Sequence, residues 1–146
     1  MLGSVGLSLT CLVLVVLLQY EIVGWLWRFN LGHRSPTRAR IALSVSGLTA
    51  LHLLQVCVFG VGYLIGERLL HLGAVTSFRG IGVQDIFYYS AEVFSTLGLG
   101  DIYATDYLRM LTSVEALTGM LLLSWSASFI VLAVQREWIA DQGREQ

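Results

Sequence analysis

The feature that most limits what this chain can fold into is a set of three long apolar segments that carry almost no charge. Residues 1–27 contain a single acid, Glu21, residues 41–66 contain no charged side chain, and residues 110–135 contain only Glu115. A helix of about 20 apolar residues crosses the hydrocarbon core of a bilayer. The segments therefore predict an all-α integral membrane protein with three transmembrane helices.

The composition excludes several other classes of protein. Charged residues make up 13% of the chain, about half of the roughly 25% found in soluble domains. A net charge of -1 argues against a nucleic-acid partner, which would need a basic excess. Cys11 and Cys57 lie inside apolar segments, so neither a disulfide framework nor a metal knuckle is expected. We find no nucleophile paired with a base and no metal-ligand cluster, so we expect neither an enzyme nor a bound cofactor.

Residues 1–27 are interpreted as an additional N-terminal transmembrane helix, on the lipid-facing periphery. A cleaved signal peptide is the alternative, but it would need a basic region before the apolar run. The first basic residue is Arg28, which favours an uncleaved helix.

The arginines predict the orientation of the chain in the membrane. Residues 28–40 contain four arginines and no acid, whereas residues 67–109 contain three arginines and five acids. The positive-inside rule therefore makes 28–40 a cytoplasmic basic loop, and places the N-terminus outside and the short tail 139–146 inside. Aromatic residues are expected near both interfaces: Trp25, Trp27 and Trp138 at the inner one, and Tyr63, Tyr103 and Tyr107 at the outer one.

A shorter segment between the second and third spans is predicted to re-enter the membrane. Residues 84–95 have the length of about three helical turns and contain no Gly or Pro, and Thr96-Leu97-Gly98-Leu99-Gly100-Asp101 follows them. Non-helical backbone at membrane depth is tolerated only inside protein or along a water-filled path. A half-length helix followed by Gly-x-Gly therefore indicates a re-entrant loop.

These six residues resemble the selectivity-filter signature of potassium channels, T-V-G-Y-G-D in its commonest form. The stretch 88–92 resembles the pore helix of small two-helix bacterial potassium channels, and residues 114–119 and 124–126 resemble their inner helix. The resemblance implies a homotetrameric pore domain over 41–138, with an outer helix at 41–66, a pore helix at 84–95, a filter at 96–101 and an inner helix at 107–135. It implies a multi-pass protein of a bacterial inner membrane.

The chemistry of potassium explains why the filter needs these residue types. A pore must replace the hydration shell of the ion with oxygen atoms, and the carbonyls of Thr96, Leu97, Gly98 and Leu99 would form stacked rings around K⁺. Successive carbonyls can face one axis only if some residues take left-handed backbone angles, which Gly98 and Gly100 accept at little cost. One chain supplies a quarter of each ring, so a homotetramer is implied, with potassium as the permeant ion.

Two residues depart from the family pattern. Leu99 stands where the family usually has Tyr, so the phenol that could bond the pore helix is missing and Tyr89 loses one expected partner. Ala104 stands where many relatives have Pro. A less selective cation channel and a non-conducting membrane accessory subunit of the same fold therefore stay open as alternatives.

Two acids are candidates for supporting the filter. The resemblance implies that Glu92, four residues before Thr96, shares a proton with Asp101. A solvated Glu92 at the outer mouth is the alternative. Glu115 lies inside the third span, where an acid is a functional candidate; it either faces the cavity or packs behind the filter against the pore helix.

Three further residues are interpreted with alternatives left open. Gly119 occupies the position of the family's inner-helix hinge, or else allows close helix packing. His52 and Gln55 lie in the middle of the second span, either as a pH sensor or as hydrogen-bonding partners of a neighbouring helix. No span carries arginine at every third position, so no voltage-sensor helix is expected.

Overall fold

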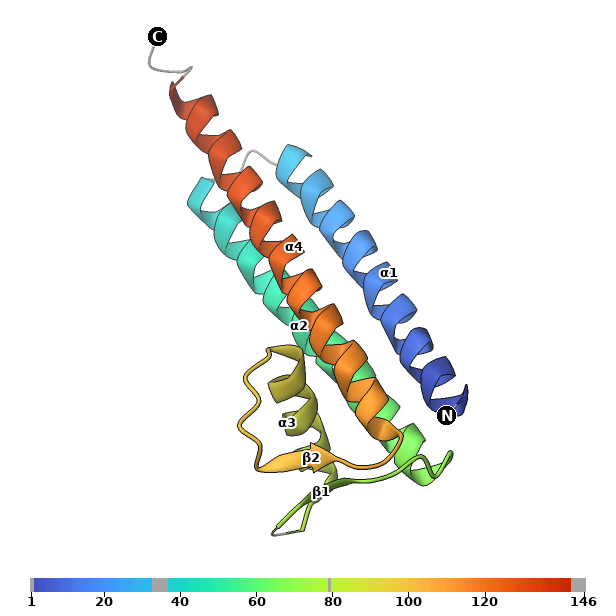
Figure 1. Cartoon of the computed structure of the whole chain (residues 1–146). Helices are drawn as coiled ribbons and strands as arrows, with labels where there is room; N and C mark the ends of the chain where they lie inside the picture. Colours follow the sequence, from blue (N-terminus) through green and yellow to red (C-terminus); the bar gives the residue numbers. More distant parts are fainter. Residues whose placement is uncertain (1, 33–36, 79, 143–146) are drawn as a thin grey trace.

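Three long helices lie side by side along most of the molecule (Figure 1). The computed structural model describes residues 2–32, 37–78 and 80–142. The long helices are α1 (Leu2–Gly32), α2 (Thr37–Arg68) and α4 (Leu108–Gln142). Each contains a stretch long and apolar enough to cross a membrane: Leu2–Phe29, Arg38–Arg68 and Leu108–Arg136. The prediction of an all-α membrane protein with three spans is confirmed.

The helices extend beyond the bounds expected from the apolar runs. Arg28 belongs to α1, and Thr37–Arg40 form the first turn of α2, so much of the expected 28–40 loop is helical. Once a span is helical, each added residue gains a hydrogen bond without a new nucleation cost. Residues 33–36 and 143–146 lie outside the described residues, and α4 continues through residues 139–142, half of the segment expected as a tail.

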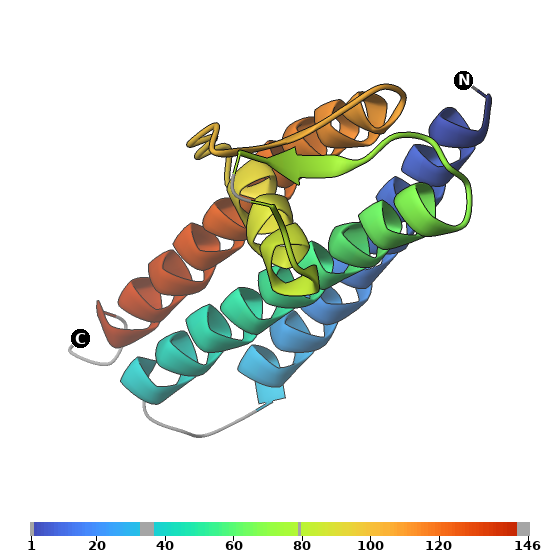
Figure 2. The ribbon, with the colours of Figure 1, turned by 90° about the horizontal axis from the view of Figure 1, so that it is seen from below.

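The short helix α3 (Val83–Phe94) packs between α2 and α4 near one end of the bundle (Figure 2). Its N-terminus is held by Asp85, whose carboxylate accepts a hydrogen bond from the Gly82 amide at 2.7 Å. At its C-terminus the Ser95 hydroxyl donates to the Ala91 carbonyl at 2.7 Å. These local bonds satisfy backbone groups that a helix end otherwise leaves unpaired, and they set the length of α3 close to the expected 84–95.

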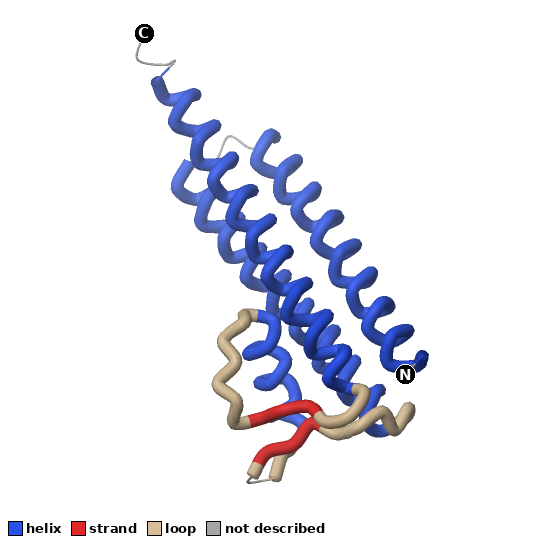
Figure 3. The backbone as a smooth tube through the Cα atoms, viewed as in Figure 1, coloured by secondary structure: helices blue, strands red, loops and turns tan. Residues whose placement is uncertain are grey.

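Two short strands close the base of the segment that contains α3 (Figure 3). Strand β1 (Val75–Ser77) pairs antiparallel with β2 (Ile102–Ala104), with Val75 opposite Ala104. Backbone bonds from the Thr105 amide to the Ala74 carbonyl and from the Tyr107 amide to the Leu72 carbonyl, both 2.9 Å, extend the pairing. The strand pair was not expected from the sequence, because strands of three residues carry no readable alternation.

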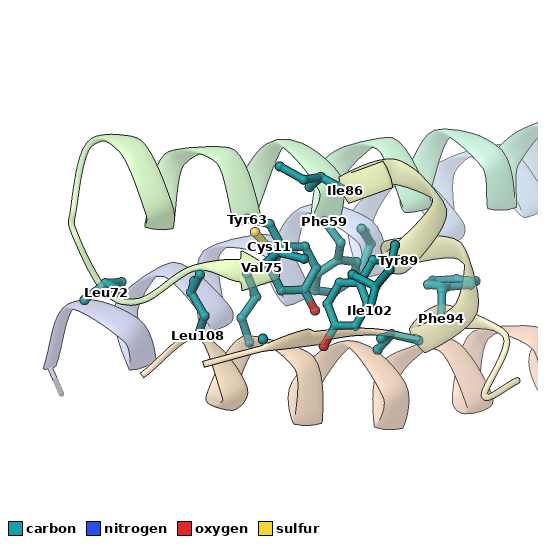
Figure 4. Packing of buried hydrophobic residues seen from close by; sticks show 14 of the residues in the cluster. Cys11, Phe59, Tyr63, Leu72, Val75, Ile86, Tyr89, Phe94, Ile102 and Leu108 are labelled. Carbon is teal, nitrogen blue, oxygen red and sulfur yellow. The ribbon is translucent and has the colours of Figure 1, made fainter. Parts of the chain in front are cut away.

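The main hydrophobic core lies where α3 meets the long helices (Figure 4). Phe59 and Tyr63 of α2 pack there with Ile86 and Tyr89 of α3, and the Tyr63 and Tyr89 rings meet edge to face at 5.2 Å between centroids. Tyr63 is fully buried, so its placement at a lipid interface was wrong: its ring fills the core, and its hydroxyl turns toward α4.

Other aromatic residues do gather at the two ends of the bundle. Tyr103 and Tyr107 are exposed at the end that carries the strands. At the opposite end Trp25 is exposed, and the Trp27 ring lies 5.9 Å from the Arg136 guanidinium. The side chain of Trp138 lies outside the described residues. This distribution fits the two interfaces of a bilayer, where amphipathic rings concentrate.

Buried polar side chains join α1 to the other two spans. The Gln19 amide donates to the Ser126 hydroxyl at 2.9 Å, and the Gln55 amide donates to the Gln19 carbonyl oxygen at 3.0 Å. The His52 ring meets the Gln55 carbonyl oxygen at 2.8 Å. All three helices therefore share one network, and α1 packs against both α2 and α4. Its expected position on the lipid-facing periphery stays a prediction.

Replacing Gln55 with Leu should lower the stability of the purified protein in lipid or mild detergent. The change removes hydrogen bonds to Val15 and Gln19, and such bonds between membrane helices contribute about 1 kcal/mol. Thermal unfolding followed by tryptophan fluorescence measures the effect. Ser124→Ala is the matched control, because the Ser124 hydroxyl bonds only to its own helix; equal midpoints for the two variants would contradict the role of the network.

Candidate functional site

The C-terminal end of α3 lies near the middle of the α4 span. A Cβ atom built on Gly119 would come within 2.1 Å of the Phe94 carbonyl oxygen, so the two backbones are in direct contact. Gly119 lies about 16 Å along α4 from its first residue, at 1.5 Å per residue, which is about half of a 30 Å hydrocarbon core. The chain then returns through residues 95–101 to β2, at the end of the bundle where α4 begins (Figure 3). This is the course of a re-entrant segment.

The contact at Phe94 gives Gly119 a packing role. Any side chain at this position would overlap the backbone of the pore helix. Helix α4 runs unbroken from Leu108 to Gln142 across Gly119. The close-packing interpretation thus has a direct structural basis, and the hinge interpretation stays a hypothesis.

The loop that follows α3 has a regular alternation of backbone angles. Thr96, Gly98 and Gly100 have φ values of 58°, 55° and 81°, while the intervening residues are not in the left-handed region. Glycine takes positive φ readily, but a β-branched residue such as threonine does so only under constraint. The Thr96 amide donates to the Val93 carbonyl, and the Leu97 amide donates to the Glu92 carbonyl, so the start of the loop is fixed to the end of α3.

The rest of this loop has no covering within its own chain. Leu97 and Leu99 are 63% and 62% exposed. A Cβ atom on Gly98 or Gly100 would meet no atom within 4 Å. Within the described residues, no hydrogen bond links the amides of residues 98–100 to another group. The loop is therefore an open ribbon beside the bundle.

Tyr89 finds a partner that compensates for the absence of a tyrosine at Leu99. Its hydroxyl lies 2.9 Å from the Thr112 hydroxyl on α4. This bond ties α3 to α4 rather than to the loop.

Glu92 is buried, with 3% of its surface exposed, while Asp101 is exposed. The Oε1 atom of Glu92 has no hydrogen-bond partner in the described part of the chain, and no bond joins it to Asp101. The neighbouring Tyr88 hydroxyl donates to Glu92, and this bond raises the pKa of Tyr88 above its ordinary value. A shared proton between Glu92 and Asp101 stays a hypothesis.

The Glu115 carboxylate packs against the pore helix. It is fully buried, and its two oxygen atoms lie 2.5 Å from the Ser90 hydroxyl of α3 and 2.6 Å from the Tyr63 hydroxyl of α2. Of the two placements considered for Glu115, the structure has the one packed against α3. Sequence analysis missed Ser90 and Tyr63 as its partners, because nothing in a single sequence pairs hydroxyls on separate helices.

His52 and Gln55 do not reach the loop itself. Gln55 belongs to the amide network with α1, and the His52 ring lies 5.8 Å from the Phe94 ring at the end of α3. Ser126 and Gln19 complete that network, and Gln19 was not singled out from the sequence. Within the described residues, no group of three or more His, Cys, Asp or Glu side chains could hold a metal ion.

Replacing Gly119 with Ala distinguishes packing from hinge bending. Alanine favours a helix by about 1 kcal/mol over glycine, so a pure hinge residue would give a more stable protein when replaced. The contact with Phe94 predicts the opposite, a lower thermal midpoint. Gly24→Ala is the control, because a Cβ atom there meets nothing within 4 Å. A midpoint for Gly119→Ala at or above that of the control would contradict the packing role.

Comparison with known proteins agrees with this geometry. A protein-family model described as an ion channel matches residues 51–136, which is more than half of the chain. The match contains α3, the loop that follows it and most of α4, and it leaves α1 outside. No curated protein and no solved structure was found to match. The chain belongs to the ion channel family with a two-helix pore module, and it is an ion channel subunit of membranes.

Proposed function

We propose that this protein is the subunit of a homotetrameric channel that passes potassium ions passively and selectively. The observation that carries the proposal is the alternation of positive φ at Thr96, Gly98 and Gly100. In a chain whose residues alternate between left-handed and right-handed angles, successive peptide carbonyls turn to the same side. The carbonyls of residues 96–99 would then line one axis and replace the water around K⁺.

The open state of the loop supports assembly into a tetramer. In hydrocarbon an unpaired backbone group costs several kcal/mol, so irregular backbone must be covered by protein or line a water-filled path. Leu97 and Leu99 point away from their own bundle and are well exposed. Neighbouring subunits would cover these side chains, while the carbonyl side of the ribbon would face the central path.

Membrane orientation follows from the charge distribution. We infer that the strands and the outer mouth face outward, with the N-terminus on the same side and the arginine-rich residues of the 28–40 segment in the cytoplasm. The partners are then the bilayer lipids, potassium ions and three further copies of the chain, in the inner membrane of a bacterium. No nucleic acid takes part.

Glu92 and Asp101 are proposed to support the filter. Glu92 is buried directly before the loop, and one of its oxygens lacks a partner. A small rotation of Asp101 toward it, or a bridging water, would supply that partner. Because two carboxylates in one confined site cannot both ionise cheaply, they would share a proton.

Two alternatives have specific support. Leu99 carries no hydroxyl, and Tyr89 bonds to Thr112 of α4 instead, which favours a filter held less stiffly and a weakly selective cation channel. A non-conducting accessory subunit would keep the fold, including the exposed loop, but would pass no current.

Purified protein in liposomes should pass K⁺ with little Na⁺, and Ba²⁺ should block the flux, since a divalent ion of similar size binds the same oxygen rings more tightly. Fluorescence-detected ion flux in opposed gradients measures this. Equal rates for the two cations would favour the weakly selective channel. The absence of ion flux in liposomes and of current in planar bilayers, across pH and voltage, would favour the accessory subunit.

Replacing Gly98 with Ala should reduce potassium flux strongly without disturbing the bundle. An L-residue at a φ of 55° costs about 1–2 kcal/mol, while no atom of the same chain blocks the new methyl group. Liposome flux and thermal stability are measured together. Gly6→Ala, also in open space, is the control; a potassium flux of Gly98→Ala equal to that of the control would contradict the role of the backbone angles.

Replacing Glu92 with Ala should change inactivation or conductance and leave the tetramer intact on gels. The variant removes the buried carboxylate that supports the filter, whereas Glu92→Gln keeps its shape and one acceptor. Single-channel recording compares the two variants. Currents of Glu92→Ala that match those of the unmodified protein would contradict the supporting role.

A further inference from the structure

The interior of the protein contains a carboxyl group whose hydrogen-bond partners among the described residues are hydroxyls. Glu115 of α4 is fully buried, as are Ser90 of α3 and Tyr63 of α2. Its Oε2 atom lies 2.6 Å from the Tyr63 hydroxyl, and its Oε1 atom lies 2.5 Å from the Ser90 hydroxyl. A single side chain thus bonds the pore helix and the outer helix to the inner helix.

The number of available protons indicates the state of this carboxyl group. The Ser90 hydroxyl lies within bonding distance of two acceptors, the Val56 carbonyl at 2.9 Å and Glu115 Oε1 at 2.5 Å. A hydroxyl carries one hydrogen, so with an ionised Glu115 one of these contacts would bring two oxygen atoms together without a hydrogen between them. If Glu115 carries a proton, it donates to Ser90, Ser90 donates to Val56, and Tyr63 donates to Glu115.

The surroundings provide no positive charge for an ionised carboxylate. The titratable groups near Glu115 are Cys11 of α1, Tyr63 of α2 and Tyr89 of α3, and none of them is a cation. In the described part of the chain, no Arg or His forms an ion pair with Glu115. A lone charge at this depth would be costly, whereas a neutral acid has all of its bonds satisfied.

We propose that Glu115 is held as the neutral carboxylic acid and donates its proton to Ser90, so that it positions the pore helix between the outer and inner helices. Ser90 lies in α3, one turn before the residues that lead into the filter loop. Glu115 therefore acts on the loop through the pore helix and touches no ion. The consequence for selectivity rests on the proposed potassium conduction, while the protonation state does not.

Infrared spectroscopy of the purified protein in lipid tests the proton directly. At neutral pH the spectrum of the unmodified protein minus that of Glu115→Gln should contain the C=O stretching band of a protonated carboxylic acid. Glu92→Gln is the matched comparison: it removes any band of the proton proposed to be shared by Glu92 and Asp101 and should keep the Glu115 band, because Glu92 is a separate buried carboxyl. Ser90→Ala should shift the Glu115 band to higher frequency, since the acid loses the acceptor of its hydrogen bond. A difference spectrum without this band, or loss of the band in Glu92→Gln, would overturn the proposal.

Potassium and sodium flux tests the positioning role. Glu115→Gln keeps a donor toward Ser90 and an acceptor toward Tyr63, so its flux ratio should match that of the unmodified protein. Glu115→Ala removes the bonds that join α4 to Ser90 and Tyr63 through this side chain, and its ratio should fall about tenfold, as expected for the net loss of one or two hydrogen bonds. A fall of equal size in Glu115→Gln would show that the charge is required and would overturn the proposal. If Glu115→Ala does not fold, the flux ratio of Glu115→Gln and the infrared band of the carboxylic acid test the proposal.

The two hypotheses fail in different ways. An unmodified protein that passes Na⁺ and K⁺ equally would refute the proposed function, and the infrared band would still report whether Glu115 carries its proton. Selective flux without the band would refute the neutral acid and leave the proposed function in place.

Discussion

The structure depends on the need to satisfy backbone polar groups at membrane depth. Helices α1, α2 and α4 satisfy their backbone groups with hydrogen bonds inside each helix. The segment between β1 and β2 turns back halfway through the bilayer and cannot satisfy all of its own backbone groups in this way. Its entrance and exit are closed by the strand pair, and its inner end is placed by the contact between Phe94 and Gly119. What stays open is the ribbon of residues 96–101, whose exposed groups require an ion, water or another subunit.

Polar side chains hold this segment in place from two sides. On one side, α3 is bonded to the spans that flank it by a group of hydroxyl and carboxyl side chains: Tyr63, Ser90, Thr112 and Glu115. On the other, Gln19, Gln55 and Ser126 bond α1 to the same two spans. Because lipid tails are as apolar as the core, the hydrophobic effect does little to hold membrane helices together. Hydrogen bonds and close glycine contacts therefore carry much of the specificity, and they join α1 to the other two spans although the family match does not include α1.

The sequence predicted the parts of the fold whose physics is local or periodic. Long charge-free runs identified the three spans, and a short helix before Gly-x-Gly identified the re-entrant segment. It could not place Tyr63, because an amphipathic residue near a helix end fits an interface and a buried hydroxyl network equally well. It also left Gly119 between hinge and contact, since a glycine looks the same in both settings until its neighbour is known.

The sequence by itself determined that the chain lies in a lipid bilayer, how many spans it has, and where the glycines stand that permit left-handed backbone angles. Each of these follows from the chemistry of neighbouring residues. Only the tertiary structure decided that Glu115 meets Ser90 and Tyr63, that Phe94 touches Gly119, and that α1 bonds to both other spans. These contacts join residues on separate helices, and their partners are fixed by how the helices pack together rather than by any spacing along the chain.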